Sequence, residues 1–193
     1  MLIRAAQEVD APAMGRVMVD TYMQAHKGHM PAEAWQKRRE EWTPEVSAQG
    51  WARSLRAIAD GSNPSDCIYL AVEKAEDTTS EEIVGLVMGG PAGVGPWENA
   101  GEIYALYILP TAQGHGAGRA LVHAAANQLF QLGMSALVIR CLQANTQGNR
   151  FYTAIGGQVV GESQEDEYGY LLPGLIYGWA DRAAMERISS ANQ

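Results

Sequence analysis

A turn with three glycines in five positions joins the clearest strand pattern of the chain to its longest helix pattern. The turn, Gln113-Gly114-His115-Gly116-Ala117-Gly118-Arg119, follows a β-branched and aromatic run over 102–108. It opens an apolar stripe that predicts a helix over 116–132. Glycine is costly where a helix begins unless a ligand approaches the backbone closely. Because a helix N-terminus presents unpaired N–H groups, the turn predicts a site for an anion, with phosphate the obvious candidate.

Two common phosphate-binding loops do not fit this turn. A P-loop ends in Gly-Lys-Ser/Thr, which is missing here. A dinucleotide fingerprint needs a third glycine where Leu121 stands and an acidic residue about 20 positions further on. No acidic residue lies between Glu102 and Glu162. A glycine-rich turn that binds nothing stays open as an alternative on the turn alone.

The distribution of charge favours a phosphorylated ligand near the turn. The formal net charge of the whole chain is −8. Residues 99–161 contain three arginines and one glutamate, a net charge of +2, which leaves −10 for the rest. An anionic ligand is therefore attracted to the turn, and a cationic second substrate to the remainder. The acidic balance argues against a nucleic-acid partner.

Strand and helix patterns alternate along the chain. We expect strands over 2–4, 67–72, 83–88, 102–108, 136–142, 158–161 and 172–179, and helices over 11–23, 32–41, 45–59, 116–132 and 146–155. The acidic stretch over 73–82 is expected to be a solvated hairpin loop. Hairpins combined with crossovers predict an α/β fold, with one domain over 1–193, a mixed sheet of about seven strands, and helices on both faces.

The two cysteines and the lack of long apolar runs bear on the compartment. Cys67 and Cys141 fall in strand patterns, which favours reduced, buried thiols in a reducing compartment. No apolar run approaches the ~20 residues that span a bilayer. Glu8 and Asp10 come before the core of a signal peptide could form. We therefore expect a cytoplasmic protein with no membrane partner.

Several motifs together resemble one family. Gln113-x-x-Gly116-x-Gly118 matches the Gln/Arg-x-x-Gly-x-Gly/Ala signature of the GNAT acyl-CoA N-acyltransferases. The segment 104–110 resembles the fourth strand of that family, and 145–156 is similar to its Asn-x-x-Ala-x-x-Phe-Tyr-x-x-x-Gly segment. Tyr177-Gly178-Trp179 looks like the last strand of many members. The resemblance covers 102–179 well, and the first hundred residues only by the order of elements.

The resemblance implies acetyl-CoA as co-substrate and a division of the chain into an acceptor-side half (1–100), an acetyl-CoA-binding core (101–161) and a terminal strand and tail (162–193). In the family, the fourth and fifth strands splay apart and the pantetheine arm lies between them. The implied cofactor-binding residues are Leu106, Ile108, Gln113, Gly114, His115, Gly116, Ala117, Gly118, Arg119 and Asn145. Leu106 and Ile108 correspond to the amides that bind pantetheine, and residues 114–119 to those that bind the pyrophosphate.

The implied reaction is attack of an amine on a thioester, so the amine must lose a proton and the departing thiolate must be stabilised. Glu102, at the start of the strand, is the candidate base, acting directly or through water. Tyr152 is the candidate acid, and the Ile108 amide a donor to the oxyanion. Glu102 as an ordinary polar residue and Tyr152 as a packing residue stay open. Cys141 is interpreted as core, because no covalent nucleophile is needed.

The acceptor side is predicted with less detail. Tyr22, His26 and Trp35 are candidate acceptor-binding residues, because the family varies its substrate site in this region. His26 and His29 lack a Cys, Asp or Glu nearby to complete a metal set, so no metal is expected. The apolar terminal strands and the tail over 181–193 point to a homodimer.

The sequence thus predicts an enzyme that transfers an acetyl group from acetyl-CoA to a primary amine of a small molecule or peptide, by direct attack in a ternary complex. The alternative is a non-catalytic acyl-CoA sensor or partner-binding module on the same fold. A transferase that uses a longer acyl chain is a third hypothesis.

Overall fold

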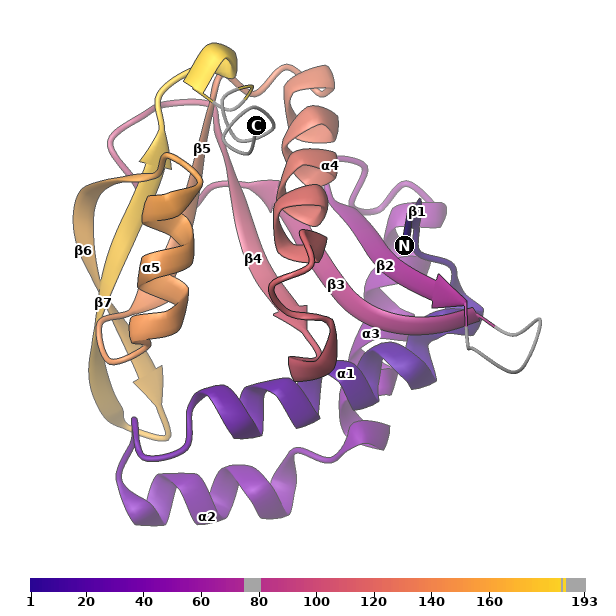
Figure 1. The fold of residues 1–193 in the computed structure, drawn as a ribbon, viewed down its shortest axis with the longest axis vertical. Helices are drawn as coiled ribbons and strands as arrows, with labels where there is room; N and C mark the ends of the chain where they lie inside the picture. Colours follow the sequence, from indigo (N-terminus) through magenta and orange to yellow (C-terminus); the bar gives the residue numbers. More distant parts are fainter. Residues whose placement is uncertain (75–80, 185, 187–193) are drawn as a thin grey trace.

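The computed structural model describes residues 1–74, 81–184 and 186 of the chain. Figure 1 shows a twisted sheet with helices packed against it. The strands are β1 (Leu2–Ala5), β2 (Cys67–Lys74), β3 (Glu81–Pro91), β4 (Ala100–Ile108), β5 (Ala136–Leu142), β6 (Gln158–Glu167) and β7 (Tyr170–Trp179). The helices are α1 (Ala11–Ala25), α2 (Ala32–Glu41), α3 (Pro44–Ala59), α4 (Ala117–Gln131) and α5 (Thr146–Ala154), with short 3₁₀ turns at Glu8–Asp10 and Pro110–Ala112.

The seven strands form one sheet in the order β1-β2-β3-β4-β5-β7-β6. β4 and β5 pair in parallel, and the other neighbouring strands pair antiparallel. A parallel pair needs a crossover connection, and α4 supplies it between β4 and β5. The sheet is therefore mixed and has seven strands, as the sequence predicts.

Each face of the sheet has its own apolar core. On one face, Leu121, Val122 and Leu129 of α4 pack with Ile155, which follows α5, and Trp179 of β7. On the other face, α1 and α3 contribute a second set of side chains, which are Ala11, Met14, Val17, Trp51 and Leu55. In Figure 1, α4 and α5 lie in front of the sheet and α3 lies behind it. The expected helices on both faces are confirmed.

Most expected elements match the structure within two or three residues, and the exceptions are polar. β6 extends to Glu167, whereas the sequence predicts an end at 161. The outer half of the strand is not predicted because it has no apolar pattern and is exposed on alternate residues. The predicted loop over 73–82 is wrong at both ends. Residues 73–74 belong to β2 and residues 81–82 to β3, where they pair across the hairpin. Residues 75–80 lie outside the described part.

Candidate active site

An extra residue in β4 opens the sheet. Ala105 pairs with Met88 of β3 and Ile103 pairs with Gly89, so Tyr104 is an unpaired bulge residue between them. An extra residue of this kind bends its strand and increases the local twist. On the other side, pairing of β4 with β5 ends at Ile103 and Ile139. The two strands part just where the bulge lies, and in Figure 1 β4 diverges from β5 and β7 towards the N-terminus of α4.

The parted half of β4 turns backbone groups towards this opening. Leu109 N–H donates to Val84 O of β3 over 2.8 Å. Successive N–H groups of a strand point to opposite edges, so those of Ile108 and Leu106 point away from β3 and into the opening. Gln113 Nε2 donates to Ile108 O at 2.9 Å, which places a donor on this same side. The opening between β4 and β5 is thus lined by two outward-facing amides.

The glycine turn lies at the mouth of the opening, at the start of α4. Gly114 and Gly116 have φ of +78° and +88°, and a Cβ on either would meet no heavy atom within 4 Å. Both are exposed, so the backbone is free to be approached. N–H groups at the start of a helix have no carbonyl partner within that helix, so those of Ala117 and Gly118 suit an anion.

Gly118 is a glycine for a different reason. A Cβ there would come within 2.9 Å of Ile108 Cδ1 and 3.1 Å of Phe151 Cζ. The close approach joins α4 to β4 and α5. Gly118 therefore allows tight packing next to the opening, whereas Gly114 and Gly116 leave open space for a ligand.

Gln113 and Asn145 have partners within the protein. Gln147 Nε2 donates to Gln113 Oε1 over 2.7 Å, which links the turn to α5 across the opening. Asn145 Oδ1 accepts from Gly148 N–H at 2.9 Å and caps α5. Both residues also line the cavity described next. His115 is exposed and Ala117 is buried.

A cavity of about 580 Å³ runs from α1, through the opening, to the glycine turn. At the α4 end it is lined by Leu106, Ile108, Gln113, Gly114, Gly116, Gly118 and Arg119, together with Asn145. At the other end, which we call the α1 end, it is lined by Tyr22 of α1, by His26, which follows α1, and by Glu167 of β6. Glu165 of β6 lines it next to Arg140. Glu102 and Tyr152 also line it. Most of the residues predicted from the sequence are therefore brought to one cavity.

The residues at the α4 end fit coenzyme A. An extended pantetheine arm needs donors along one side, and Leu106 and Ile108 direct N–H groups into the opening. A pyrophosphate needs several N–H groups and room to approach, which the open Gly114 and Gly116 and the start of α4 offer. The cavity joins the two regions without interruption.

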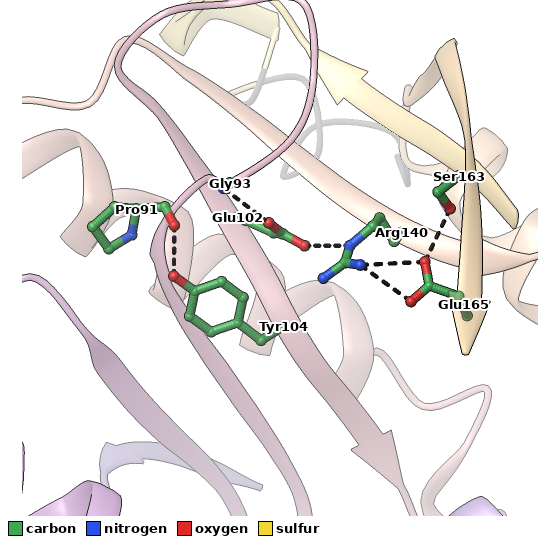
Figure 2. A network of polar contacts seen from close by, with 7 residues as sticks. All are labelled: Pro91, Gly93, Glu102, Tyr104, Arg140, Ser163 and Glu165. Carbon is green, nitrogen blue, oxygen red and sulfur yellow. Dashed lines mark hydrogen bonds and ion pairs between the residues drawn. The ribbon is translucent and has the colours of Figure 1, made fainter. Parts of the chain in front are cut away.

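Glu102 is buried at the beginning of the opening. It is 2% exposed. Its Oε1 accepts from Arg140 Nε at 2.7 Å, and its Oε2 accepts from Gly93 N–H at 3.4 Å. Arg140 also donates from Nη1 to both oxygens of Glu165, at 3.3 and 3.1 Å, and Ser163 donates to Glu165 at 3.0 Å. Figure 2 shows Arg140 lying between the two carboxylates.

Tyr152 lies among aromatic rings. It is 8% exposed, and its ring centroid is 5.3 Å from that of Phe151 and 5.5 Å from that of Tyr177. Burial raises the pKa of its hydroxyl well above the usual value. The hydroxyl therefore holds its proton firmly and is suited to donate a hydrogen bond.

The α1 end combines aromatic rings with a paired carboxylate. Tyr22 O–H donates to Glu167 Oε1 at 2.8 Å, and Arg38 of α2 pairs with the other oxygen of Glu167. The Arg38 guanidinium lies 5.1 Å from the ring centroids of both Tyr22 and Trp42 and 5.3 Å from that of Tyr168. These contacts fix the tip of the β6–β7 hairpin against α1 and α2.

Of the two other predicted acceptor-side residues, His26 lines the cavity and Trp35 is not among its lining residues. His26 is 9% exposed, and its Nδ1 has no hydrogen-bond partner in the part of the chain that the structure describes. Burial lowers its pKa to about 4, so the ring is neutral near pH 7. Trp35 packs against the cluster of Tyr22, Met30 and Ala34.

Both cysteines lie in the core of the protein. Cys67 and Cys141 are free and buried, and burial raises the pKa of Cys141 to about 12, as expected of core residues. Among the described residues, no three His, Cys, Asp or Glu side chains group to hold a metal ion. Within the same residues, no helix is both long and apolar enough to cross a membrane.

Four charged residues of the site were not predicted from the sequence, and these are Arg38, Arg140, Glu165 and Glu167. One signal was present, because Arg140 interrupts an otherwise apolar strand pattern over 136–142 and a charge in such a place needs a partner. Arg140 is 38 positions from Glu102 and 25 from Glu165 in the chain. Arg38 is 129 positions from Glu167. Periodicity over a short window cannot find such pairs.

A sheet that opens between two parallel strands, with a glycine turn at the opening, is the architecture of the acyl-CoA N-acyltransferases. The structure is similar to the PaiA N-acetyltransferase of Thermoplasma acidophilum in complex with coenzyme A, with a TM-score of 0.68, 17% identity, and 93% of this chain and 98% of that chain covered. It is also similar to ribosomal-protein-alanine N-acetyltransferase of Brucella melitensis, with a TM-score of 0.63, 18% identity, and coverage of 93% and 99%. At such identities the likeness shows the fold.

The sequence itself matches the same class. An uncharacterized N-acetyltransferase of Bacillus subtilis (strain 168), YuaI, is 34% identical over 88 residues, which are 46% of this chain and 50% of that protein. The chain thus spans about half the length of this curated relative. The model of the acetyltransferase (GNAT) family matches residues 30–156, more than half of the chain. The chain belongs to this family, which confirms the resemblance and the fold expected from it.

Proposed function

We propose that the protein transfers an acetyl group from acetyl-CoA to a primary amine of a small molecule or peptide, by direct attack within a ternary complex. The main support is the continuous cavity, which joins the opening in the sheet and the glycine turn to an end that contains carboxylates. Family membership supports acetyl-CoA as the donor. The division into a donor core over 101–161 and an acceptor side over 1–100 stays a proposal, and β6 adds Glu165 and Glu167 to the acceptor side.

Donor binding is assigned to backbone groups. Leu106 and Ile108 donate N–H groups to the pantetheine arm, and residues 114–119 donate theirs to the pyrophosphate. When bound, acetyl-CoA supplies an activated acyl thioester. At the thioester end of the pantetheine arm, the Ile108 N–H is assigned to the oxyanion that forms when the amine attacks. Holding both substrates in one cavity makes the attack effectively intramolecular.

Proton transfer is assigned to two side chains. The acceptor amine is protonated near neutral pH, and Glu102 accepts its proton directly or through water. Tyr152 O–H donates a hydrogen bond to the departing thiolate, and the second proton of the nitrogen, released as the amide forms, is available to that thiolate. The three carboxylates of Glu102, Glu165 and Glu167 outnumber the two arginines paired with them, and this excess of negative charge favours an acceptor that arrives as a cation.

The experiment is release of free thiol from acetyl-CoA in the presence of an amine panel that contains small primary amines, lysine-like side chains and peptide N-termini. Amine-dependent thiol release, with the acetylated amine detected by mass spectrometry, supports the proposal. Calorimetric binding of acetyl-CoA without thiol release from any amine favours the alternative, an acyl-CoA sensor. Longer acyl-CoAs in the same assay test the choice of acyl chain. A homodimer stays a prediction, which light scattering at micromolar concentration tests.

A further inference from the structure

A single guanidinium joins two carboxylates at the point where the sheet opens. The pairing of β5 with β4 ends at Ile139, and Arg140 is the next residue of β5. Its Nε donates to Glu102 of β4 at 2.7 Å, and its Nη1 donates to Glu165 of β6 at 3.1 Å. Three strands are thus connected through one side chain, and Figure 2 shows the arrangement.

The negative charge of the buried Glu102 carboxylate is balanced by the Arg140 guanidinium. The Glu102 side chain is 3% exposed, compared with 36% for Arg140 and 28% for Glu165. A buried carboxylate that loses its cation favours the protonated form, because burial penalises charge. The second Glu102 oxygen is 3.4 Å from Gly93 N–H, a long hydrogen bond that cannot replace the guanidinium.

Arg140 is itself held in place from the outside. Glu165 accepts from Nη1 with both oxygens, and Ser163 donates to Glu165 Oε1 at 3.0 Å. Ser163 and Glu165 are on β6, so the orientation of Arg140 depends on a strand that does not neighbour β5. Glu165 therefore acts on Glu102 only through the guanidinium.

We propose that Arg140 is a positioning residue, which keeps Glu102 ionised and directed into the cavity, and that Glu165 fixes Arg140 for this task. The inference rests on the proposed function, in which Glu102 accepts the proton of the amine. Tyr104 of β4, whose hydroxyl donates to Pro91 O at 2.6 Å, interacts electrostatically with Glu102 and also with Asp66, which precedes β2. Neither carries the positive charge needed to replace Arg140.

A purely structural role predicts something different. If the ion pairs only hold β5 and β6 together, removing Arg140 lowers stability but leaves the pH dependence of the reaction unchanged. If Arg140 keeps Glu102 ionised, its removal moves the acid limb of the pH profile to higher pH. The pH profile therefore separates the two roles.

The experiment compares Arg140→Met and Arg140→Lys with Arg53→Met, which removes an exposed arginine of α3. Turnover is followed across about pH 5.5 to 9 with saturating acetyl-CoA. For Arg140→Met we expect turnover to fall about tenfold or more near pH 7 and the acid limb to move up by about one pH unit or more. Arg140→Lys keeps the charge and should restore the position of the limb. The KM for acetyl-CoA should stay within about twofold in all three.

Glu165→Gln provides a second variant should Arg140→Met fold poorly. It leaves Arg140 and Glu102 in place, and we expect a smaller shift of the acid limb in the same direction. Unchanged acid limbs in both Arg140→Met and Glu165→Gln would overturn the proposal.

A readout without turnover separates this inference from the proposed function. Carbon-13 NMR of labelled glutamate carboxyls, assigned with Glu102→Gln, gives the titration of Glu102 directly. A titration midpoint that moves up in Arg140→Met supports the inference even if no amine releases thiol from acetyl-CoA. A midpoint that does not move contradicts it, whatever the activity of the wild-type protein.

Discussion

At the scale of single residues, two glycines allow a matched test, because Gly116 lies in the glycine turn and Gly61 lies outside it, after α3. Both have positive φ, +88° and +77°, and a Cβ on either meets no heavy atom within 4 Å. Alanine therefore costs each position about 1–2 kcal/mol of strain. We expect Gly116→Ala to weaken acetyl-CoA binding about tenfold, because the methyl group lies where the pyrophosphate approaches. Gly61→Ala should leave affinity unchanged.

Calorimetry of both variants checks this prediction. Equal affinities would remove the glycine turn from the donor site. Gly118 is less suitable for the purpose, because a larger side chain there displaces Ile108 and Phe151 and lowers stability together with affinity.

Tyr152→Phe keeps the ring among its neighbours and removes the hydroxyl. If the hydroxyl donates to the departing thiolate, turnover should fall about 10²-fold, and the affinity for acetyl-CoA should hardly change. Tyr177→Phe is the matched control, since Tyr177 is also buried and its ring lies 5.5 Å away. Steady-state kinetics decide the question. Loss of donor affinity with turnover intact at saturation would make Tyr152 a packing residue.

Glu102→Gln retains the shape of the side chain and an oxygen for Arg140 but cannot take up a proton. Turnover should fall about 10²-fold near pH 7, and the deficit should shrink as pH rises, because the free amine needs no base. Glu98→Gln changes an exposed carboxylate four positions earlier and should have no effect. A deficit that stays constant with pH would rule out Glu102 as the base.

At the scale of elements, the Arg38–Glu167 pair joins α2 to the β6–β7 hairpin beside the α1 end of the cavity. Arg38→Ala removes the ion pair of Glu167 and keeps its hydrogen bond from Tyr22. We expect this variant to lose about 1 kcal/mol in acceptor binding, which corresponds to about a fivefold rise in the KM of the amine. The KM of acetyl-CoA should not change. Arg39→Ala, at the neighbouring exposed position of α2, is the control, and equal effects of the two variants would contradict the prediction.

Elements with a strong pattern could be predicted from sequence, and those without one could not. β4 and α4 are long and regular in their apolar positions, so their bounds were found to within two residues. The outer half of β6 is polar on both faces, and its strand form depends on pairing with β7. The residues proposed to bind the cofactor could be selected from a local motif. Arg140 and Glu165 could not, because they meet Glu102 only once three strands have come together.

At the scale of the whole molecule, His26 links stability to pH. Its pKa is lowered from 6.5 to about 4 by burial, so the unfolded chain binds a proton more readily than the folded one. Stability should therefore be complete above about pH 6.5 and fall as the pH drops towards 4, by about 3 kcal/mol for this group.

Denaturant unfolding at several pH values checks this expectation. His26→Met should remove most of the dependence between about pH 6.5 and 4, because the apolar side chain carries no proton. His115→Met, at an exposed position of the glycine turn, should keep the wild-type slope. The same slope in His26→Met as in wild type would assign the dependence to other groups.

The bulge at Tyr104 makes the shape of the donor groove independent of the side chains that contact the acceptor. The opening depends on the number of residues in β4 between its pairings with β3, rather than on which side chains they bear. Substitutions along β6, α1 and α2 can therefore alter the choice of acceptor while the donor groove keeps its shape. Deletion of the bulge residue would instead restore continuous pairing of β4 with β3 and remove the bend at which β4 parts from β5. New specificity is thus open to gradual change by substitution, whereas the groove is kept or lost in a single step.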